Sequence, residues 1–333
     1  MLCSDLARTR TLLPLLSRSV VRNGLDMSPG VLSYLRAATL REELRAERLR
    51  PIGATALSAL ERAGVNAFVV RGVTLAATVY ERWPLRHCHD LDLLVAPAEL
   101  TTAVRALAAA DCVPVGPALG PRAGARLQHT SGMGLAVHTR PFGVGFYDAP
   151  VEHFARPDRC IRVAGASART VSSEATLVHV LGHATYSASR RNLRWVTDAW
   201  HLLAAGTPLD WDDIVVRLDA YRLTLPVAVL LRYISEFGME VPADVLVRVT
   251  RRAQAATSVA EDVALGGALA ARSGDLRTLW RSTRSWRSRA RFARWLVAPS
   301  PAYMRSTFRV ESAWLYPLLY ACRPVRFVTT RFV

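Results

Sequence analysis

The chain lacks lysine altogether, so all 43 basic residues among its 333 residues are arginines. Isoleucine, asparagine and glutamine are also scarce, whereas alanine, valine, leucine and arginine abound. This bias is typical of a GC-rich genome, which accounts for part of the basicity. The formal net charge of +16 is therefore not by itself evidence of nucleic-acid binding.

Close cysteine pairs and long apolar runs are also missing. The five cysteines are an odd number and stand far apart, which argues against a disulfide framework and a cysteine-rich zinc site. This usage favours a reducing cytoplasm. The longest uncharged apolar stretch near the end, Ala313 to Cys322, is half the length of a membrane span, so we expect no transmembrane helix. The short apolar run after Thr11 is broken by Pro14, and we expect no signal peptide.

Basic residues concentrate at the C-terminal end. From Leu276 onward there are twelve arginines and one acid, Glu311, so this segment carries +11 of the net charge of +16. Arginines recur every three or four residues from 277 to 294, with tryptophans between them. Two interpretations stay open: residues 276–333 contact an anionic surface, RNA or an acidic partner, or they form a solvated helix whose tryptophans pack on the domain.

Hydrophobic periodicity divides the chain into three parts. Residues 1–64 favour helices, because apolar residues recur at helical spacing after the start signal Ser28-Pro29. Residues 65–168 contain short runs typical of strands, at 67–70, 91–95, 126–130 and 134–140. Residues 169–333 return to helical periodicity. We therefore expect an α+β protein with an N-terminal helical segment, a small α/β core and a C-terminal helical domain.

Two carboxylates stand on the second predicted strand. Asp90 and Asp92 alternate with Leu91 and Leu93, so both acids project from one face, roughly 6.5–7 Å apart along the backbone. Two acids on one face repel each other unless a cation or a proton lies between them. Mg²⁺ prefers such oxygen ligands, which makes Asp90 and Asp92 the candidate metal ligands. A pair of solvated edge acids gives the same pattern.

A strand-to-helix turn at Arg71-Gly72 precedes these acids by about twenty residues. The N–H groups of a helix N-terminus can meet a phosphate at such a turn, and glycine permits the bend. The guanidinium of Arg71 and the hydroxyl of Thr74 are further phosphate donors. Arg86, four residues before Asp90, can reach an anion beside the metal. The predicted nucleotide-binding residues are therefore Arg71, Gly72, Thr74 and Arg86.

These segments resemble the nucleotidyltransferase superfamily, which includes DNA polymerase beta, and most of all its poorly characterised bacterial members. The resemblance rests on Arg71-Gly72-Val73-Thr74-Leu75 and on Arg86-x-x-x-Asp90-Leu91-Asp92-Leu93-Leu94-Val95, with weaker likeness over about residues 60–310. It implies a small mixed sheet as the nucleotidyltransferase core. It also implies that a nucleoside triphosphate, such as ATP, binds with Mg²⁺ or Mn²⁺ and donates its nucleotide to an unknown hydroxyl acceptor, which is a small molecule, a peptide or a protein.

The chain departs from the superfamily pattern at Ala136. The resemblance implies a third acid at about this position, two residues before His138, which ends the next predicted strand. Alanine neither binds a metal nor takes a proton. Either another group, such as His138, Asp148 or Glu152, replaces this acid, or turnover is weak, or the protein binds nucleotide without transferring it. His138 therefore joins Asp90 and Asp92 as a candidate catalytic residue.

Two pairs of histidines have two interpretations each. His87 and His89, next to the aspartates, match a zinc site or ordinary loop histidines. His179 and His183 stand four apart on an apolar helix, which matches either metal ligation or packing between domains.

Asp198 stands four residues after Arg194 on a predicted helix, which matches a structural ion pair or a contact with the acceptor or the base. Three functions remain open at this point. They are a nucleotidyltransferase, a catalytically degenerate nucleotide-binding or scaffold protein, and an anionic-surface or RNA-binding protein.

Overall fold

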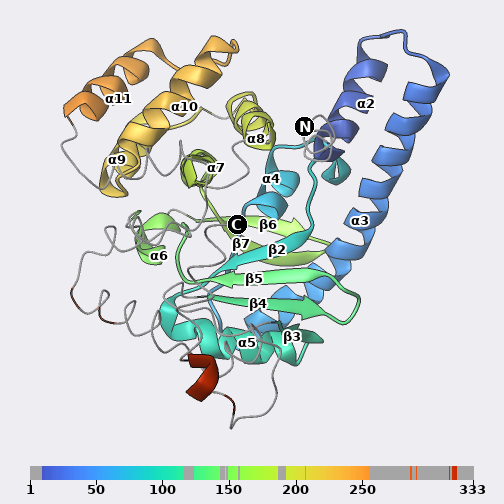
Figure 1. Cartoon of the computed structure of the whole chain (residues 1–333), viewed down its shortest axis with the longest axis vertical. Coiled ribbons are helices and arrows are strands. Elements are labelled where there is room, and N and C mark those ends of the chain that lie inside the picture. Colours follow the sequence, from blue (N-terminus) through green and yellow to red (C-terminus); the bar gives the residue numbers. More distant parts are fainter. Residues whose placement is uncertain are drawn as a thin grey trace.

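The computed structural model describes residues 10–115, 124–142, 147, 149–156, 158–186, 193–206, 208–255, 286, 290, 315 and 317–320. A seven-stranded mixed sheet lies at the centre of this part of the chain, in the order β3-β4-β5-β2-β1-β7-β6 (Figure 1). The strands are β1 (Phe68–Val70), β2 (Asp90–Leu94), β3 (Cys112–Pro114), β4 (Gly124–His129), β5 (Gly134–His138), β6 (Asp158–Val163) and β7 (Ala166–Val171). β2 is parallel to β5 and β1 is parallel to β7, whereas the other neighbouring pairs are antiparallel.

Helices precede, interrupt and follow the strands. The N-terminal ones are the 3-10 turn η1 (Arg10–Leu12) and the helices α2 (Leu13–Arg22) and α3 (Pro29–Arg62). Between strands lie α4 (Gly72–Thr78), η2 (Trp83–Leu85), η3 (Pro97–Glu99), α5 (Leu100–Ala108) and α6 (Val151–Phe154). The C-terminal helices are α7 (Ser173–Tyr186), α8 (Arg194–Leu203), α9 (Trp211–Ala220), α10 (Thr224–Glu236) and α11 (Ala243–Ala255). Figure 1 shows α2 and α3 as a hairpin on one side of the molecule and α8 to α11 gathered on the other.

Alternation along β2 sends its residues to two different cores, because successive side chains of a strand point to opposite faces. Leu91 and Leu93 are buried in a core that includes Leu57 of α3 and Leu107 of α5. Leu94 is buried in the other core, which β1 shares with α7, α8, α9, α10 and α11. The sheet therefore has α3 and α5 on one face and the C-terminal helices on the other. Asp90 and Asp92 alternate with the leucines of the first core, so they belong to the face of the C-terminal helices.

The α+β class and the mixed sheet expected from the sequence are confirmed. The runs predicted as strands at 67–70, 91–95, 126–130 and 134–140 correspond to β1, β2, β4 and β5. The β6–β7 hairpin is additional, and the boundary predicted between 168 and 169 falls inside β7. Its turn at Ala164-Gly165 has φ values of 48° and 90°, a backbone conformation that favours glycine and closes tight hairpins. The division into three domains stays a prediction.

Most of residues 276–333 lie outside the described part of the chain, so the prediction that this basic segment contacts RNA or an anionic surface also stays a prediction. None of the helices described is both long enough and apolar enough to cross a membrane.

A buried ion pair joins the C-terminal helices to the loop before β2. Arg86 donates from Nε and Nη2 to the two carboxylate oxygens of Asp198 on α8, at 2.6 and 2.8 Å. The hydroxyl of Tyr80 donates to the same carboxylate at 2.7 Å. Burial disfavours the charged form of Arg86, but Asp198 outweighs this effect and raises the pKa of the guanidinium. Because both charges are compensated, the pair holds α8 in a defined position beside the sheet.

We expect Asp198→Ala to lower the free energy of unfolding by about 3–5 kcal/mol, because Arg86 would keep a buried charge without its carboxylate. Urea unfolding followed by circular dichroism measures this loss. Glu236→Ala is the control: Glu236 pairs with Arg232 at 3.8 Å on the surface, where both side chains are exposed. This control should change the free energy by at most about 1 kcal/mol. Equal losses in the two variants would contradict the role of the buried pair.

Gly182 on α7 packs closely against Phe142 and Leu223. A Cβ added there would lie 2.6 Å from Cε1 of Phe142 and 3.1 Å from Cδ1 of Leu223. We expect Gly182→Ala to destabilise the protein by about 1–3 kcal/mol, because the ring of Phe142 must shift in a filled core. Gly30→Ala in α3 meets no atom within 4 Å, so this control should leave stability unchanged or slightly raised. Thermal unfolding of both variants tests the difference. Unchanged stability of Gly182→Ala would contradict the expectation and show that the ring of Phe142 can shift without cost.

Candidate active site

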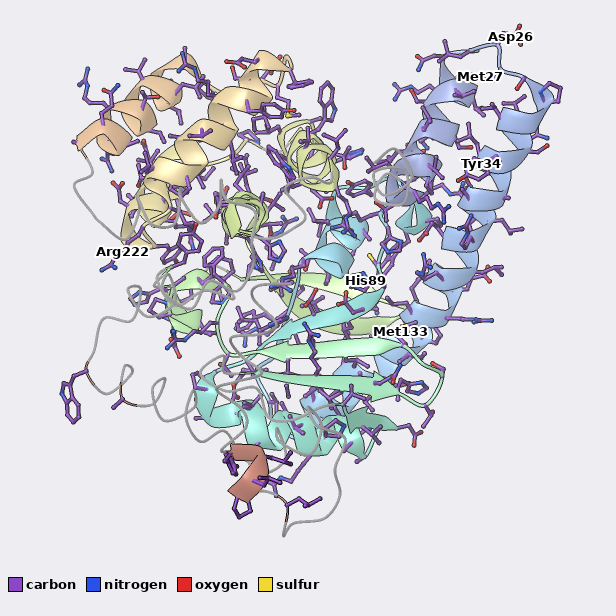
Figure 2. All side chains as sticks on the ribbon, in the orientation of Figure 1. Asp26, Met27, Tyr34, His89, Met133 and Arg222 are labelled. Carbon is purple, nitrogen blue, oxygen red and sulfur yellow. The ribbon has the colours of Figure 1, made fainter. Side chains whose placement is uncertain are left out.

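Asp90 and Asp92 project from β2 into a site between the sheet and the C-terminal helices. In the parallel register with β5, Asp90 is level with Gly134 and Asp92 is level with Ala136. Asp92 is buried, with 6% of the residue exposed, whereas the side chain of Asp90 is 29% exposed. Figure 2 labels His89 at the beginning of β2 and Met133 just before β5, at the same end of these two strands. The two predicted metal ligands therefore share a face, and Asp90 is the more accessible.

Asp92 is held by two donors from neighbouring elements. Nη1 of Arg71 donates to Oδ1 of Asp92 at 2.9 Å, and Nε2 of His138 contacts the same oxygen at 2.7 Å. Nη1 of Arg71 and Nε2 of His138 are 3.4 Å apart. Burial opposes ionisation of Asp92, but the charge of Arg71 and the hydrogen bond with His138 outweigh it and lower the pKa of this carboxyl. Asp92 is therefore a fixed anion at neutral pH.

Asp90 has a different environment. Burial and the nearby charge of Asp92 raise its pKa above the ordinary value of an aspartate. Nε2 of His89 lies 3.3 Å from Oδ2 of Asp90. The ring of His89 stacks on that of His87 with centroids 5.6 Å apart, and Nδ1 of His87 contacts the carboxylate of Glu42 on α3 at 3.0 Å. A line of polar groups thus connects α3 with Asp90.

The backbone of the turn between β1 and α4 is strained at Arg71. Its φ of 62° and ψ of −126° lie in a region that non-glycine residues rarely adopt, at a cost of about 1–3 kcal/mol. This conformation accompanies the contacts of its guanidinium with Asp92 and His138. Gly72 follows, and a Cβ there would lie 3.2 Å from Sγ of Cys88. The glycine therefore permits the loop before β2 to approach α4 closely.

Two residues predicted to bind phosphate have structural contacts instead. The Thr74 hydroxyl is buried, donates to the carbonyl oxygen of Val69 at 2.8 Å and lies 2.8 Å from the hydroxyl of Thr170. The guanidinium of Arg86 forms the buried ion pair with Asp198 described above. Both groups were predicted to lie near the site because of their spacing from Gly72 and Asp90. That spacing contains no information about which distant residue each group meets.

Three residues of the C-terminal helices lie within electrostatic range of the aspartates. His179 is buried with Nε2 2.8 Å from the carbonyl oxygen of Pro141, which agrees with the packing interpretation of this residue. Burial, and then the charge of Arg71, lower the pKa of His183 to about 3. Burial also lowers the pKa of Arg194, whose charge interacts with Asp90. His183 and Arg194 were not predicted as site residues, because only the tertiary fold brings α7 and α8 to this face.

The residue beside Asp92 on β5 is Ala136, where the resemblance implied an acid. Among the described residues, no group of three or more histidine, cysteine or acidic side chains has the arrangement of a metal site, which also leaves the zinc interpretation of His87 and His89 unsupported. Glu152, a predicted replacement for the acid, is exposed on α6. Asp148, the other replacement, lies outside the described residues.

The donor set fits one divalent cation of the kind that the superfamily implies. Mg²⁺ commonly binds through one or two carboxylates and completes its shell with water and phosphate oxygens. Asp90 is partly exposed, and the contacts of Asp92 with Arg71 and His138 both use Oδ1. The two aspartates can therefore offer oxygen ligands to one such ion. In the described part of the chain, a further carboxylate for a second ion is missing beside Asp92, because Ala136 occupies that place.

Comparisons with known proteins found a family and a solved structure to which the chain is similar. A crystal structure of an antigenic nucleotidyltransferase-like protein from Paracoccidioides brasiliensis is similar, with 14% sequence identity, a TM-score of 0.38, and coverage of 57% of this chain and 90% of that chain. No curated protein matches the chain. Residues 3–238 match the family described as uncharacterised nucleotidyltransferase, which is more than half of the chain. The chain therefore belongs to this family of nucleotidyltransferases.

Proposed function

We propose that the protein transfers a nucleotide from a nucleoside triphosphate, with ATP as the first candidate, to an acceptor in a reaction that depends on Mg²⁺ or Mn²⁺. The observation that supports this proposal most is the pair of aspartates on one face of β2, one fixed as an anion by Arg71 and His138 and one more accessible. Membership of the nucleotidyltransferase family supports the same reaction class. We place the activity in the cytoplasm, in keeping with the free thiols of Cys88, Cys112 and Cys160.

Each residue of the site has a separate part in this proposal. Asp90 and Asp92 would hold the divalent ion. When bound, the ion would neutralise charge that develops on the phosphate oxygens. His138 contacts Oδ1 of Asp92 and keeps this carboxylate ionised and oriented, which makes it a positioning residue. The guanidinium of Arg71 contacts both Asp92 and His138. It would present a cation toward the phosphates, next to the backbone of Gly72.

Thr74 and Arg86 support the site from behind in this proposal. The Thr74 hydroxyl ties α4 to β1 and β7 through Val69 and Thr170, and so fixes the turn that carries Arg71. Arg86 fixes α8 through Asp198, and α8 carries Arg194. In the reaction, an acceptor oxygen forms a bond to the α-phosphorus, the bond between the α-phosphorus and the bridging oxygen breaks, and pyrophosphate leaves with the electron pair. A neutral hydroxyl acceptor, as the resemblance implies, would also release a proton.

A second candidate function rests on Ala136. Because the position beside Asp92 on β5 has no carboxylate, the protein could bind a nucleotide with Mg²⁺ without transferring it, as a sensor or scaffold. Nucleotide binding without release of pyrophosphate in the presence of small-molecule, peptide and protein acceptors would favour this candidate over the enzyme.

Replacing both aspartates with asparagine tests the proposed site. We expect Asp90→Asn with Asp92→Asn to abolish Mg²⁺-dependent ATP binding and to reduce pyrophosphate release by about a hundredfold or more, because amides are weaker ligands and carry no charge. Calorimetric titration with ATP and a pyrophosphate assay measure the two effects. Asp26→Asn is the matched control, since Asp26 lies at the far end of the α2–α3 hairpin (Figure 2). Undiminished ATP binding in the double variant would refute the assignment.

A further inference from the structure

A row of three residues crosses the sheet on the face of the candidate site. Arg126 of β4 stands directly opposite Ala136 in the antiparallel pair, and Ala136 is level with Asp92 in the parallel pair of β5 with β2. In-register neighbours project from the same face of a sheet. The next residues along the strands, Leu127 and Leu135, are buried in the core on the opposite face, which confirms the alternation. The row therefore presents a cation, a methyl group and a carboxylate in this order.

The cationic end of this row is accessible. Arg126 is exposed and Ala136 is partly exposed, whereas Asp92 is buried. Within the described part of the chain, the side chain of Arg126 has no carboxylate partner. Arg126 and Asp92 are two strand spacings apart, roughly 10 Å between backbones. The side chain between them is only the methyl group of Ala136, so a small anion can reach Arg126 next to the candidate metal ligands.

The chemistry of this row distinguishes two classes of acceptor. A neutral alcohol must lose a proton as it attacks, which calls for a general base close to its oxygen. Ala136 supplies no base, and the nitrogen of His138 that faces Asp92 is already engaged by that carboxylate. A phosphate monoester has its second pKa near 6 and is mostly a dianion at neutral pH, so its oxygen needs no base. A carboxylate at position 136 would repel such an acceptor, whereas a guanidinium opposite attracts it.

We propose that the acceptor carries a phosphate group, which Arg126 binds beside Ala136, and that an oxygen of this phosphate is the nucleophile. This inference rests on the proposed function and replaces the hydroxyl acceptor with an anionic one. The acceptor oxygen forms a bond to the α-phosphorus of the triphosphate, and the bond from the α-phosphorus to the bridging oxygen breaks. Pyrophosphate leaves with the electron pair, no proton moves, and the product contains a new phosphorus–oxygen–phosphorus bridge.

Arginine suits this task better than other cations. Its planar guanidinium donates two parallel hydrogen bonds to the oxygens of one phosphate, which fixes the orientation of the group as well as its position. Orientation matters because in-line attack needs the acceptor oxygen opposite the leaving pyrophosphate. We therefore expect Arg126→Lys to retain the charge and part of the phosphate affinity, and to lose the orientation.

Binding of inorganic phosphate to the full chain tests the proposal without relying on turnover. We expect calorimetric titration to show about a tenfold loss of phosphate affinity in Arg126→Ala, the size of a lost hydrogen-bonded charge contact. Arg105→Ala is the matched control for charge, because Arg105 is an exposed residue of α5 on the other face of the sheet, and it should change affinity by less than about twofold.

Two substitutions at one position separate charge from size. Ala136→Asp adds a carboxylate between Arg126 and Asp92, and Ala136→Asn adds a neutral side chain of nearly equal volume. We expect Ala136→Asp to bind phosphate about tenfold more weakly than Ala136→Asn, because like charges at this distance repel. Circular dichroism confirms that each variant folds. Equal affinities in these two variants, unchanged affinity in Arg126→Ala, or no phosphate binding by the unaltered chain would each overturn the proposal.

ATP affinity in the presence of Mg²⁺ identifies which phosphate Arg126 binds. Unchanged ATP affinity in Arg126→Ala, together with weakened phosphate affinity, assigns Arg126 to the acceptor. Weakened ATP affinity in this variant would place Arg126 on the triphosphate and refute the acceptor assignment. If the unaltered chain binds phosphate through Arg126 but does not bind ATP, the proposed function fails and the anion site remains. The two failures are thus distinguishable.

Discussion

The burial of one carboxylate, Asp92, is the constraint on which the candidate site depends. An aspartate taken from water into a folded interior is tolerated as an anion only when donors replace its hydration. Arg71 and His138 do this from two different elements, the end of β1 and the end of β5. Both donors must reach the same carboxylate, and two local features accompany this. The backbone at Arg71 adopts a positive φ, and β5 ends with His138, which is level with Leu94 and reaches back two residues to Asp92.

The same constraint gives the two aspartates of β2 different environments and different tendencies to ionise. Asp92 is fixed as an anion by its donors, whereas burial and the neighbouring charge raise the pKa of Asp90. Arg71 compensates part of the charge of Asp92, whose remaining charge still raises the pKa of Asp90. This balance suits one divalent ion that arrives with a negatively charged triphosphate better than it suits two free ions. Environment, rather than residue type, therefore assigns the two carboxylates their roles.

Local patterns were enough to predict the core strands and the acid pair, because alternation and turn signals are properties of a few consecutive residues. The four strands predicted between residues 67 and 140 are present, and the two aspartates share a face as expected. Contacts across long separations were not predictable in this way. Arg86 meets Asp198 across 112 positions, and the hydroxyl of Thr74 meets Thr170 across 96. Sequence periodicity does not indicate which distant residues will be in contact. Both Arg86 and Thr74 were therefore expected to contact a phosphate.

The register of β4 with β5 changes the meaning of the alanine at position 136. Considered alone, Ala136 is a lost acid, which favours a degenerate protein. The turn at Ser131 and Gly132 joins β4 to β5, and this hairpin places Arg126 opposite Ala136. When the two residues are considered together, the position beside Asp92 has no carboxylate, and the next strand places a cation opposite this position. An anionic acceptor would gain from this arrangement in two ways. The cation lowers the free energy of the bound acceptor, and no carboxylate at position 136 repels it.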